Sequence, residues 1–195
     1  MPRTTDEQRE RREMDILRVA GQMILEHGYN QLNMDELAER VGISKPTLYQ
    51  HFRTKEDMVA HAVIHATEAM ERFILSLQEG TPLQRLEKIM RYVVNTHFDP
   101  KNTPAALMHG HTQEVLQHHV AVHAVRERSA GLLYGLVQEG KIHGEIRADL
   151  LPQVVIGGLF SMIGILEFYG RNIPTPQREV MVEQVVDLFL RGVRA

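Results

Sequence analysis

Apolar residues recur along most of this chain at the spacing of an α-helix rather than that of a β-strand. A short example is the set Met34, Leu37 and Val41, which lie on one face of a helix. Asn33 precedes this set and Glu36 follows three positions later, which is the capping-box pattern of a helix start. No stretch shows a persuasive strand pattern, so the sequence predicts an all-α fold.

A sharp turn and a second short helix follow directly. Gly42 can adopt positive φ without steric cost, so it can end the first helix and turn the chain. Ser44 can cap the next helix, and Pro46 falls in its first turn, where a missing N–H is tolerated. Leu48 and Phe52, four positions apart, are predicted to anchor this helix in the core.

Two helices joined in this way have the layout of a helix-turn-helix, whose second helix lies in the DNA major groove. The side chains left to face outward are Lys45, Thr47, Tyr49, Gln50 and His51. Lys45 and Gln50 are the strongest candidates to read bases, since lysine can donate to guanine and glutamine can pair with adenine.

The charge of the whole chain is −3, which gives no indication of a nucleic-acid partner. Between residues 40 and 55, however, the charged residues are the cations Arg40, Lys45, Arg53 and Lys55, with no carboxylate among them. A basic patch on the docking surface is what neutralisation of DNA phosphates requires. The segment therefore predicts contact with double-stranded DNA.

The same segment resembles the DNA-binding domain of the TetR (tetracycline repressor) family of bacterial regulators. The resemblance covers about residues 10–62, and it is carried by Leu37-Ala38, Val41-Gly42-Ile43-Ser44, Thr47-Leu48-Tyr49, His51-Phe52 and Lys55-Glu56. Gly28-Tyr29 also fits. Pro46 departs from the pattern, which often has glycine or another small residue at that place. Gln50 falls at a position that varies within the family, so the resemblance does not give the operator sequence.

The resemblance implies a homodimer that binds double-stranded DNA. It implies that the residues of the second helix approach bases or backbone, and that His51 and Lys55 lie near phosphates. The full predicted DNA-binding set is Ser44, Lys45, Pro46, Thr47, Tyr49, Gln50, His51 and Lys55. The alternative for each of these side chains is plain exposure to solvent.

The helical pattern continues beyond the motif. Thr54 caps a third helix that runs to near Gly80 and is expected to bridge two domains. A first helix from a Thr4–Glu7 capping box to Gly28 is predicted too, and later helices at about 82–98, 105–116, 118–142, 152–169 and 175–194. We predict a helix-turn-helix DNA-binding domain of three helices at residues 1–56, and a larger helical effector-binding and dimerisation domain at residues 57–195.

The stretch 152–169 is apolar on nearly every side, so it must be covered on all sides. In a domain this small a partner subunit is the simplest cover, and we predict an isologous dimer built from the last two helices of each chain. The predicted interface residues are Val155, Gly158, Phe160, Met162, Val182, Val185, Val186, Phe189 and Val193. The alternative is packing within one chain. Such a dimer would place two recognition helices about one DNA turn apart, or a multiple of it, on a near-palindromic site.

An effector pocket in the C-terminal domain is also implied by the resemblance. Its predicted lining is Met70, Phe73, Leu77, Met90, Val94, Phe98, Leu107, Met108 and His111. Methionines among these residues would give an adaptable wall for a hydrophobic ligand. The alternative for each residue is an ordinary place in the core.

Most of the 11 histidines lie after residue 60, and the His109–His123 region is crowded with them. Imidazoles could bind zinc, nickel or cobalt, which would make the chain a metal-responsive regulator. No flanking carboxylate completes an obvious site, so exposed or hydrogen-bonded histidines are the preferred interpretation, and no metal is predicted.

Composition excludes several other classes. The chain has no cysteine, so disulfides, thiolate zinc sites and cysteine nucleophiles are absent. Its N-terminus has no signal-peptide core, and its longest apolar run, 154–166, is too short for a membrane span. We expect a cytoplasmic chain with no membrane partner and no cofactor. Phosphate-binding loops and nucleophile elbows are also absent, so we do not expect an enzyme.

Together these interpretations predict a transcriptional regulator. It is most simply a repressor, released from its operator when a small, largely hydrophobic effector of unknown identity binds the C-terminal domain. Two alternatives remain open: a DNA-binding protein that uses no ligand, architectural or linked to division, and the metal-responsive regulator described above.

Overall fold

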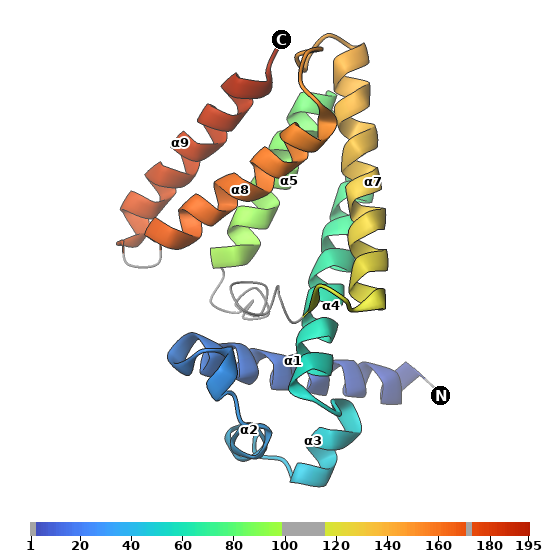
Figure 1. Cartoon of the computed structure of the whole chain (residues 1–195), viewed down its shortest axis with the longest axis vertical. Helices are drawn as coiled ribbons and strands as arrows, with labels where there is room; N and C mark the ends of the chain where they lie inside the picture. Colours follow the sequence, from blue (N-terminus) through green and yellow to red (C-terminus); the bar gives the residue numbers. More distant parts are fainter. Residues whose placement is uncertain (1–2, 99–115, 171–172) are drawn as a thin grey trace. The chain divides into compact units, whose positions relative to one another are not determined.

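The computed structural model describes residues 3–98, 116–170 and 173–195, and the regular elements in these ranges are helices (Figure 1). They are α1 (Arg3–His27), the 3₁₀ turn η1 (Tyr29–Gln31), α2 (Met34–Val41), α3 (Lys45–His51), α4 (Lys55–Ser76), α5 (Pro82–Phe98), α7 (Val120–Ile142), α8 (Pro152–Gly170) and α9 (Thr175–Val193). The all-α prediction is confirmed. The helix predicted at about 105–116 lies, except for its last residue, outside the described residues.

Some helix ends differ from the prediction. Helix α1 already includes Arg3, so Thr4 lies within the helix rather than capping it. Helix α4 ends at Ser76, before Gly80, because polar side chains take up the carbonyls of its last turn. Ser76 Oγ donates to the carbonyl of Phe73 at 2.7 Å, and Gln78 Nε2 donates to that of Leu75 at 2.6 Å.

The chain forms two compact units. The N-terminal unit contains the described residues up to Thr67 together with those between His97 and Val125, and the C-terminal unit contains Glu68–Thr96 and Arg126–Ala195. The boundary between the units therefore falls inside α4, near the end of α5 and inside α7. The domain boundary after residue 56 stays a prediction.

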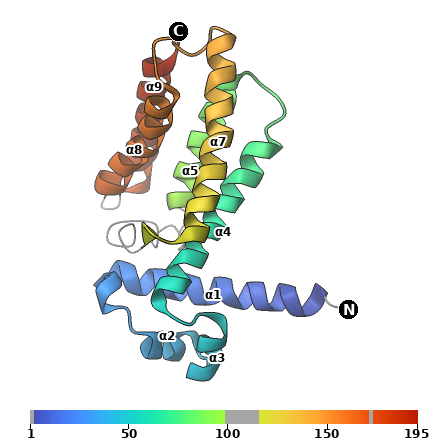
Figure 2. The same cartoon turned by 45° about the vertical axis from the view of Figure 1, so that its right-hand side comes forward.

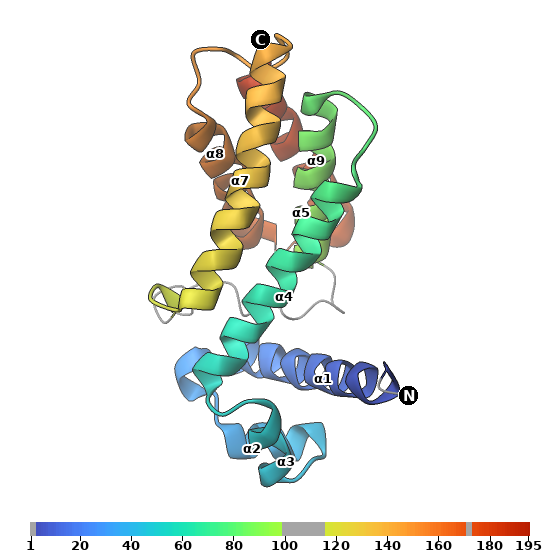
Figure 3. The same cartoon turned by 90° about the vertical axis from the view of Figure 1, so that its right-hand side faces the viewer.

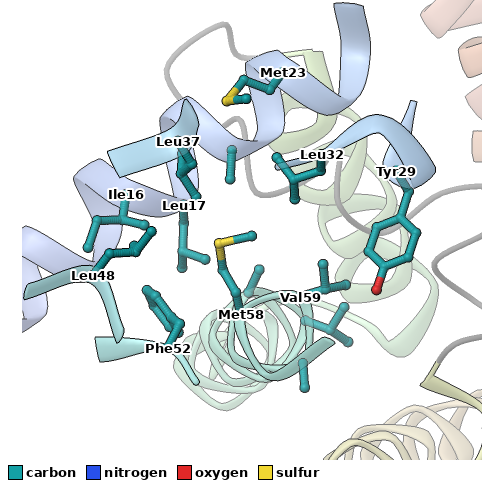
Figure 4. Packing of buried hydrophobic residues seen from close by; sticks show 14 of the residues in the cluster. Ile16, Leu17, Met23, Tyr29, Leu32, Leu37, Leu48, Phe52, Met58 and Val59 are labelled. Carbon is teal, nitrogen blue, oxygen red and sulfur yellow. The ribbon is translucent and has the colours of Figure 1, made fainter. Parts of the chain in front are cut away.

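The N-terminal unit is built around one apolar cluster, in which α1, α2, α3 and the start of α4 meet (Figure 4). Leu48 and Phe52 have no exposed surface, as their spacing predicted. The other large buried side chains shown in Figure 4 are Ile16, Leu17, Met23, Tyr29, Leu32, Leu37, Met58 and Val59. Because both helices of the motif contribute to this cluster, burial of apolar surface fixes α3 on the unit.

In the C-terminal unit, the apolar face of α5 is buried through Leu86, Ile89, Met90 and Val94. Helices α8 and α9 lie side by side, as Figures 1 and 2 both show. Helix α9 is tied to α5 by the guanidinium of Arg91, which donates to both carboxylate oxygens of Glu183 at 2.5 and 2.8 Å. That pair raises the pKa of Arg91 above its ordinary value, so this guanidinium stays charged.

The end of α7 is packed closely against the chain that follows it. A Cβ added at Gly140 would lie 2.6 Å from Cδ1 of Ile146, so a side chain there would force the buried Ile146 to move. Ile146 then pairs with Arg194 in an isolated antiparallel bridge, and Arg147 N donates to the carbonyl of Val193 at 2.9 Å. None of the described helices is long and apolar enough to cross a membrane.

Candidate nucleic-acid interface and effector region

Helix α2 begins and ends as its residues predicted. Asn33 Oδ1 accepts hydrogen bonds from the backbone N–H groups of Asp35 at 2.8 Å and Glu36 at 3.4 Å. Gly42 has φ 77°, the left-handed conformation that lets the chain leave the helix. The N–H groups of Gly42 and Ile43 both donate to the carbonyl of Ala38 at 3.0 Å. The turn between α2 and α3 is therefore held by local hydrogen bonds.

Helix α3 is capped by Ser44 and presents Lys45, Tyr49 and Gln50 to solvent. Ser44 Oγ accepts a hydrogen bond from the N–H of Thr47 at 3.2 Å. It also lies 2.7 Å from Thr47 Oγ1, so the two hydroxyls share a hydrogen bond. Lys45 and Gln50 are exposed, and Tyr49 is 44% exposed. Pro46 also faces solvent. The outward surface of α3 thus combines a cation, an amide and a phenol, which can bind phosphates and base edges.

His51 and Lys55 are held by neighbours within the N-terminal unit. His51 Nδ1 lies 3.1 Å from Glu13 Oε1, and its side chain is 14% exposed. Burial alone would raise the pKa of the Glu13 carboxyl, but hydrogen bonds from Arg9 and His51 outweigh burial and lower that pKa. Lys55 Nζ stands 4.8 Å from the ring centroid of Tyr29, in cation–π contact. Both side chains thereby join the motif to its scaffold.

The basic patch predicted for residues 40–55 carries less free charge than its sequence indicates. Arg40 NH1 lies 2.7 Å from Glu26 Oε2, and Arg40 NH2 lies 3.0 Å from Glu36 Oε1. Lys45 Nζ lies 2.6 Å from Asp35 Oδ2, and this hydrogen bond raises the pKa of Lys45. The segment itself contains no carboxylate, but the fold brings in carboxylates from α1 and α2. Binding to phosphate must therefore compete with Asp35 for Lys45.

We expect Asp35→Asn to strengthen binding to DNA. The amide keeps the shape of the carboxylate but frees Lys45 for a phosphate, so the plot of log affinity against log salt should steepen by about 0.9. Fluorescence anisotropy of a labelled duplex across a salt series measures this slope. Glu127→Gln, the same change of charge at an exposed position on α7, is the control and should leave the slope unchanged. A slope for Asp35→Asn equal to that of the control would show that the ion pair does not restrain Lys45.

The residues predicted for the effector pocket are placed in different surroundings. Met90 and Val94 are buried in the core. The ring of Phe73 stacks on that of Tyr92, with centroids 4.1 Å apart. Leu77 lines a cavity of about 310 Å³ between α4, α5 and α7, and Met70 is half-buried. Leu107, Met108, His111 and the side chain of Phe98 lie outside the described residues. Sequence reasoning did not identify the other residues of that cavity, which include Gly131, Gly135 and Arg85.

The residues predicted for the dimer interface also divide into two groups. Those buried within the chain are Val155, Val185, Val186, Phe189 and Val193. Gly158 faces Phe189, whose Cε2 would lie 3.6 Å from an added Cβ. Phe160 is exposed, and Met162 and Val182 are half-buried. The residues of the first group are covered within one chain, while other apolar side chains of α8 and α9 stay at the surface.

The described histidines make local contacts. His119 Nδ1 accepts from the N–H of Val122 at 3.4 Å, at the start of α7. His123 Nε2 lies 2.7 Å from the carbonyl oxygen of Gln117. Within the described residues no three histidines, aspartates or glutamates are grouped as a metal site requires. His109 and His111 lie outside these residues, so the metal-responsive alternative stays a prediction.

Residues 16–62 match the family described as bacterial regulatory proteins, tetR family. This range covers most of the buried cluster, the two short helices and the start of α4. These residues are thus similar to the DNA-binding domain of the TetR family. The helix-turn-helix that the resemblance of residues 10–62 predicted is confirmed, and the matching family consists of transcriptional regulators.

Two relatives show how far the likeness extends in sequence. The HTH-type transcriptional activator FasR of Mycolicibacterium smegmatis is 42% identical over 50 residues, which is 26% of this chain and 23% of FasR. This chain thus matches less than a quarter of that relative. The fatty acid metabolism regulator protein of Bacillus subtilis is 25% identical over 155 residues, which is 77% of this chain and 78% of the relative.

Solved structures share the fold over nearly the whole chain. The ketosteroid transcriptional regulator KstR2 of Mycobacterium tuberculosis superimposes with a TM-score of 0.74 at 20% identity, covering 94% of this chain and 95% of KstR2. AibR in complex with isovaleryl coenzyme A and operator DNA gives a TM-score of 0.67 at 21% identity, covering 91% of this chain and 97% of AibR. At these identities the likeness shows the helical fold of the family.

Proposed function

We propose that this chain is a TetR-family regulator that acts as a dimeric repressor. In this proposal α3 of each protomer binds one half of a near-palindromic operator, and a small, largely hydrophobic effector that binds the C-terminal unit releases the protein from DNA. The role is one of binding and not of catalysis. The observation that carries the proposal is α3 itself, an internally capped helix that is anchored by Leu48 and Phe52 and leaves Lys45, Tyr49 and Gln50 exposed.

Two features support DNA binding by α3. Its scaffold is held by local hydrogen bonds, because Asn33, Gly42 and Ser44 satisfy backbone groups at the ends of two short helices. Its outward side chains have the chemistry that the major groove requires, since lysine donates to guanine and glutamine pairs with adenine. AibR, which shares the fold, was solved on operator DNA.

The surface of α8 and α9 supports a dimer. Large apolar side chains are exposed there after the two helices have packed on each other, and they are Val154, Phe160, Ile165, Val180 and Leu188. Side chains of this size are more stable when a partner covers them. An isologous interface uses the same surface of both chains and fits two half-sites related by two-fold symmetry.

An acyl compound is the effector class that the relatives favour. The relative from Bacillus subtilis is named for fatty acid metabolism, and AibR was solved with isovaleryl coenzyme A. For release to occur, the effector must bind the conformation that leaves DNA more tightly than the one that holds it. About 1.4 kcal/mol of this preference changes operator affinity tenfold.

We expect Gln50→Ala to weaken binding to the operator while binding to unrelated DNA changes little. A bidentate pair with one base contributes about 1–3 kcal/mol of discrimination, which is roughly fivefold to 150-fold in affinity. An operator selected from random duplexes, followed by anisotropy titrations on operator and unrelated duplexes, gives both values. Gln22→Ala, at an exposed site on α1, is the matched control. Equal losses on both duplexes would show that Gln50 does not read bases.

A further inference from the structure

The N-terminal turns of α1 extend beyond the core of their unit. Helix α1 starts at Arg3, yet residues 6–12 are exposed, and the first buried side chain that follows them is Ile16. Figure 3 shows this end of the helix running past α3, as Figures 1 and 2 also do. We call residues 6–12 the α1 overhang. About two helical turns are therefore kept outside the apolar cluster.

The buried face of α1 decides which side of the overhang is turned toward α3. Met23, Ala20 and Ile16 form one face of this helix, and all three belong to the buried cluster that includes residues of α3 (Figure 4). Steps of four and then three residues back from Ile16 keep to the same face and lead to Arg12 and Arg9. The face that packs on the helix-turn-helix thus continues into the overhang as two arginines.

Hydrogen bonds join the overhang to the last residue of α3. Glu13 Oε1 accepts from Arg9 Nε at 3.0 Å and lies 3.1 Å from Nδ1 of His51. The side chains of Glu13 and His51 are 17% and 14% exposed, so their contact is largely covered. The overhang is therefore continuous with the helix that carries the candidate base-reading side chains.

Arg12 is a cation of this face that no carboxylate neutralises. It is exposed, and its side chain makes no ion pair or hydrogen bond with any residue that the structure describes. Asp15, one turn further along, does not pair with it. The carboxylates of the overhang itself stand about 120° or more around the helix from Arg12, and they are Asp6, Glu7 and Glu10.

DNA would bring an anion to this place. The major groove is about 8.5 Å deep, so a ridge of phosphates rises beside a helix that lies in it. The overhang passes the end of α3 and turns Arg12 to the side on which that ridge would stand. A guanidinium binds phosphate oxygens bidentately. Arg40 and Lys45, by contrast, already bind carboxylates of α1 and α2.

We propose that the α1 overhang is a second DNA-binding surface, on which Arg12 binds a backbone phosphate next to the bases that α3 contacts. This inference rests on the proposed function, because it enlarges the same protein–DNA interface. A phosphate contact carries no sequence information, so Arg12 adds affinity equally on the operator and on unrelated duplexes.

Anisotropy of labelled duplexes across a salt series tests the contact. Arg12→Gln removes one cation, so the plot of log affinity against log salt should become shallower by about 0.9 for each bound protomer. The loss of affinity should be equal on a selected operator and on an unrelated duplex. Arg12→Lys keeps the charge and should keep the slope. Because Arg12 is exposed, both variants should melt at the temperature of the unaltered chain.

Arg11→Gln is the matched control. Arg11 precedes Arg12 in the overhang and is exposed as well, but it points about 100° around the helix from Arg12, away from α3. Its substitution makes the same change of charge and should leave the slope unchanged. Equal slopes for Arg11→Gln and Arg12→Gln would mean that Arg12 makes no contact of its own, which overturns the proposal.

A methylphosphonate, which removes the charge of one phosphate, locates the contact when it is placed at each position of the operator in turn. One position in each half-site should weaken binding of the unaltered chain and have no effect on Arg12→Gln. Absence of such a position overturns the proposal and leaves the proposed function standing. An unaltered chain that binds no selected duplex overturns the proposed function itself. A change of oligomeric state in Arg12→Gln without DNA would show that a protein surface covers the overhang, which also overturns the proposal.

Discussion

Replacement of Phe52 by alanine should lower the free energy of unfolding of the N-terminal unit by about 3–5 kcal/mol. Phe52 has no exposed surface, and its ring stands edge-on to His61 with centroids 5.5 Å apart. Removal of the ring leaves a cavity where α3 meets α4. Because whole domains are stable by only about 5–15 kcal/mol, the unit that carries α3 should unfold at moderate urea concentration, and operator binding should fail with it.

Urea titration followed by circular dichroism, with hydrogen exchange to resolve the two units, measures this loss. Ile142→Ala removes an aliphatic side chain that is 83% exposed, and it should change the stability by less than about 0.5 kcal/mol. A loss for Phe52→Ala no larger than that of this control would mean that Phe52 does not anchor the motif.

The helix-turn-helix could be predicted because its signals are local. Asn33 caps α2 through residues two and three positions away, and Ser44 caps α3 through Thr47. Gly42 turns the chain by its own backbone conformation. Each of these effects depends on neighbours within one helical turn, which a reading along the sequence can see.

The charge of the interface could not be predicted in the same way. Arg40 and Glu26 are 14 positions apart, and His51 and Glu13 are 38 apart, so each pair depends on how α1 packs against the motif. The segment 40–55, from which the basic patch was predicted, does not contain Glu13 or Glu26. His51 was predicted to face outward near phosphates, yet its ring is mostly covered beside Glu13.

The sequence could not show which face of α8 is buried within one chain, because apolar residues occur on all sides of this helix. The fold divides them. Val155 and Leu159, four positions apart, are buried, while Val154 and Phe160 remain exposed. The packing of neighbouring helices decides which apolar residues form the core of one chain and which stay at the surface.

The second large effect that we expect concerns the exposed apolar side chains of α8 and α9. Phe160→Glu should convert the dimer to monomers at micromolar concentration. Phe160 is 42% exposed in the single chain, and in an isologous interface each substitution occurs twice. An unpaired charge buried at an interface costs about 3–5 kcal/mol, and every 1.4 kcal/mol weakens association about tenfold. Operator affinity should fall as well, because one protomer reaches only one half-site.

Sedimentation equilibrium of Phe160→Glu and Leu188→Glu, beside Ile142→Glu as a control, separates a loss of dimers from a loss of fold. Ile142 is an exposed apolar residue at the end of α7, so its substitution adds the same charge away from the two helices. The circular dichroism spectra of all three variants should be alike, and only the control variant should sediment as a dimer. If the two variants on α8 and α9 remain dimeric, the two-fold contact lies elsewhere, and the exposed side chains of α8 and α9 require another partner.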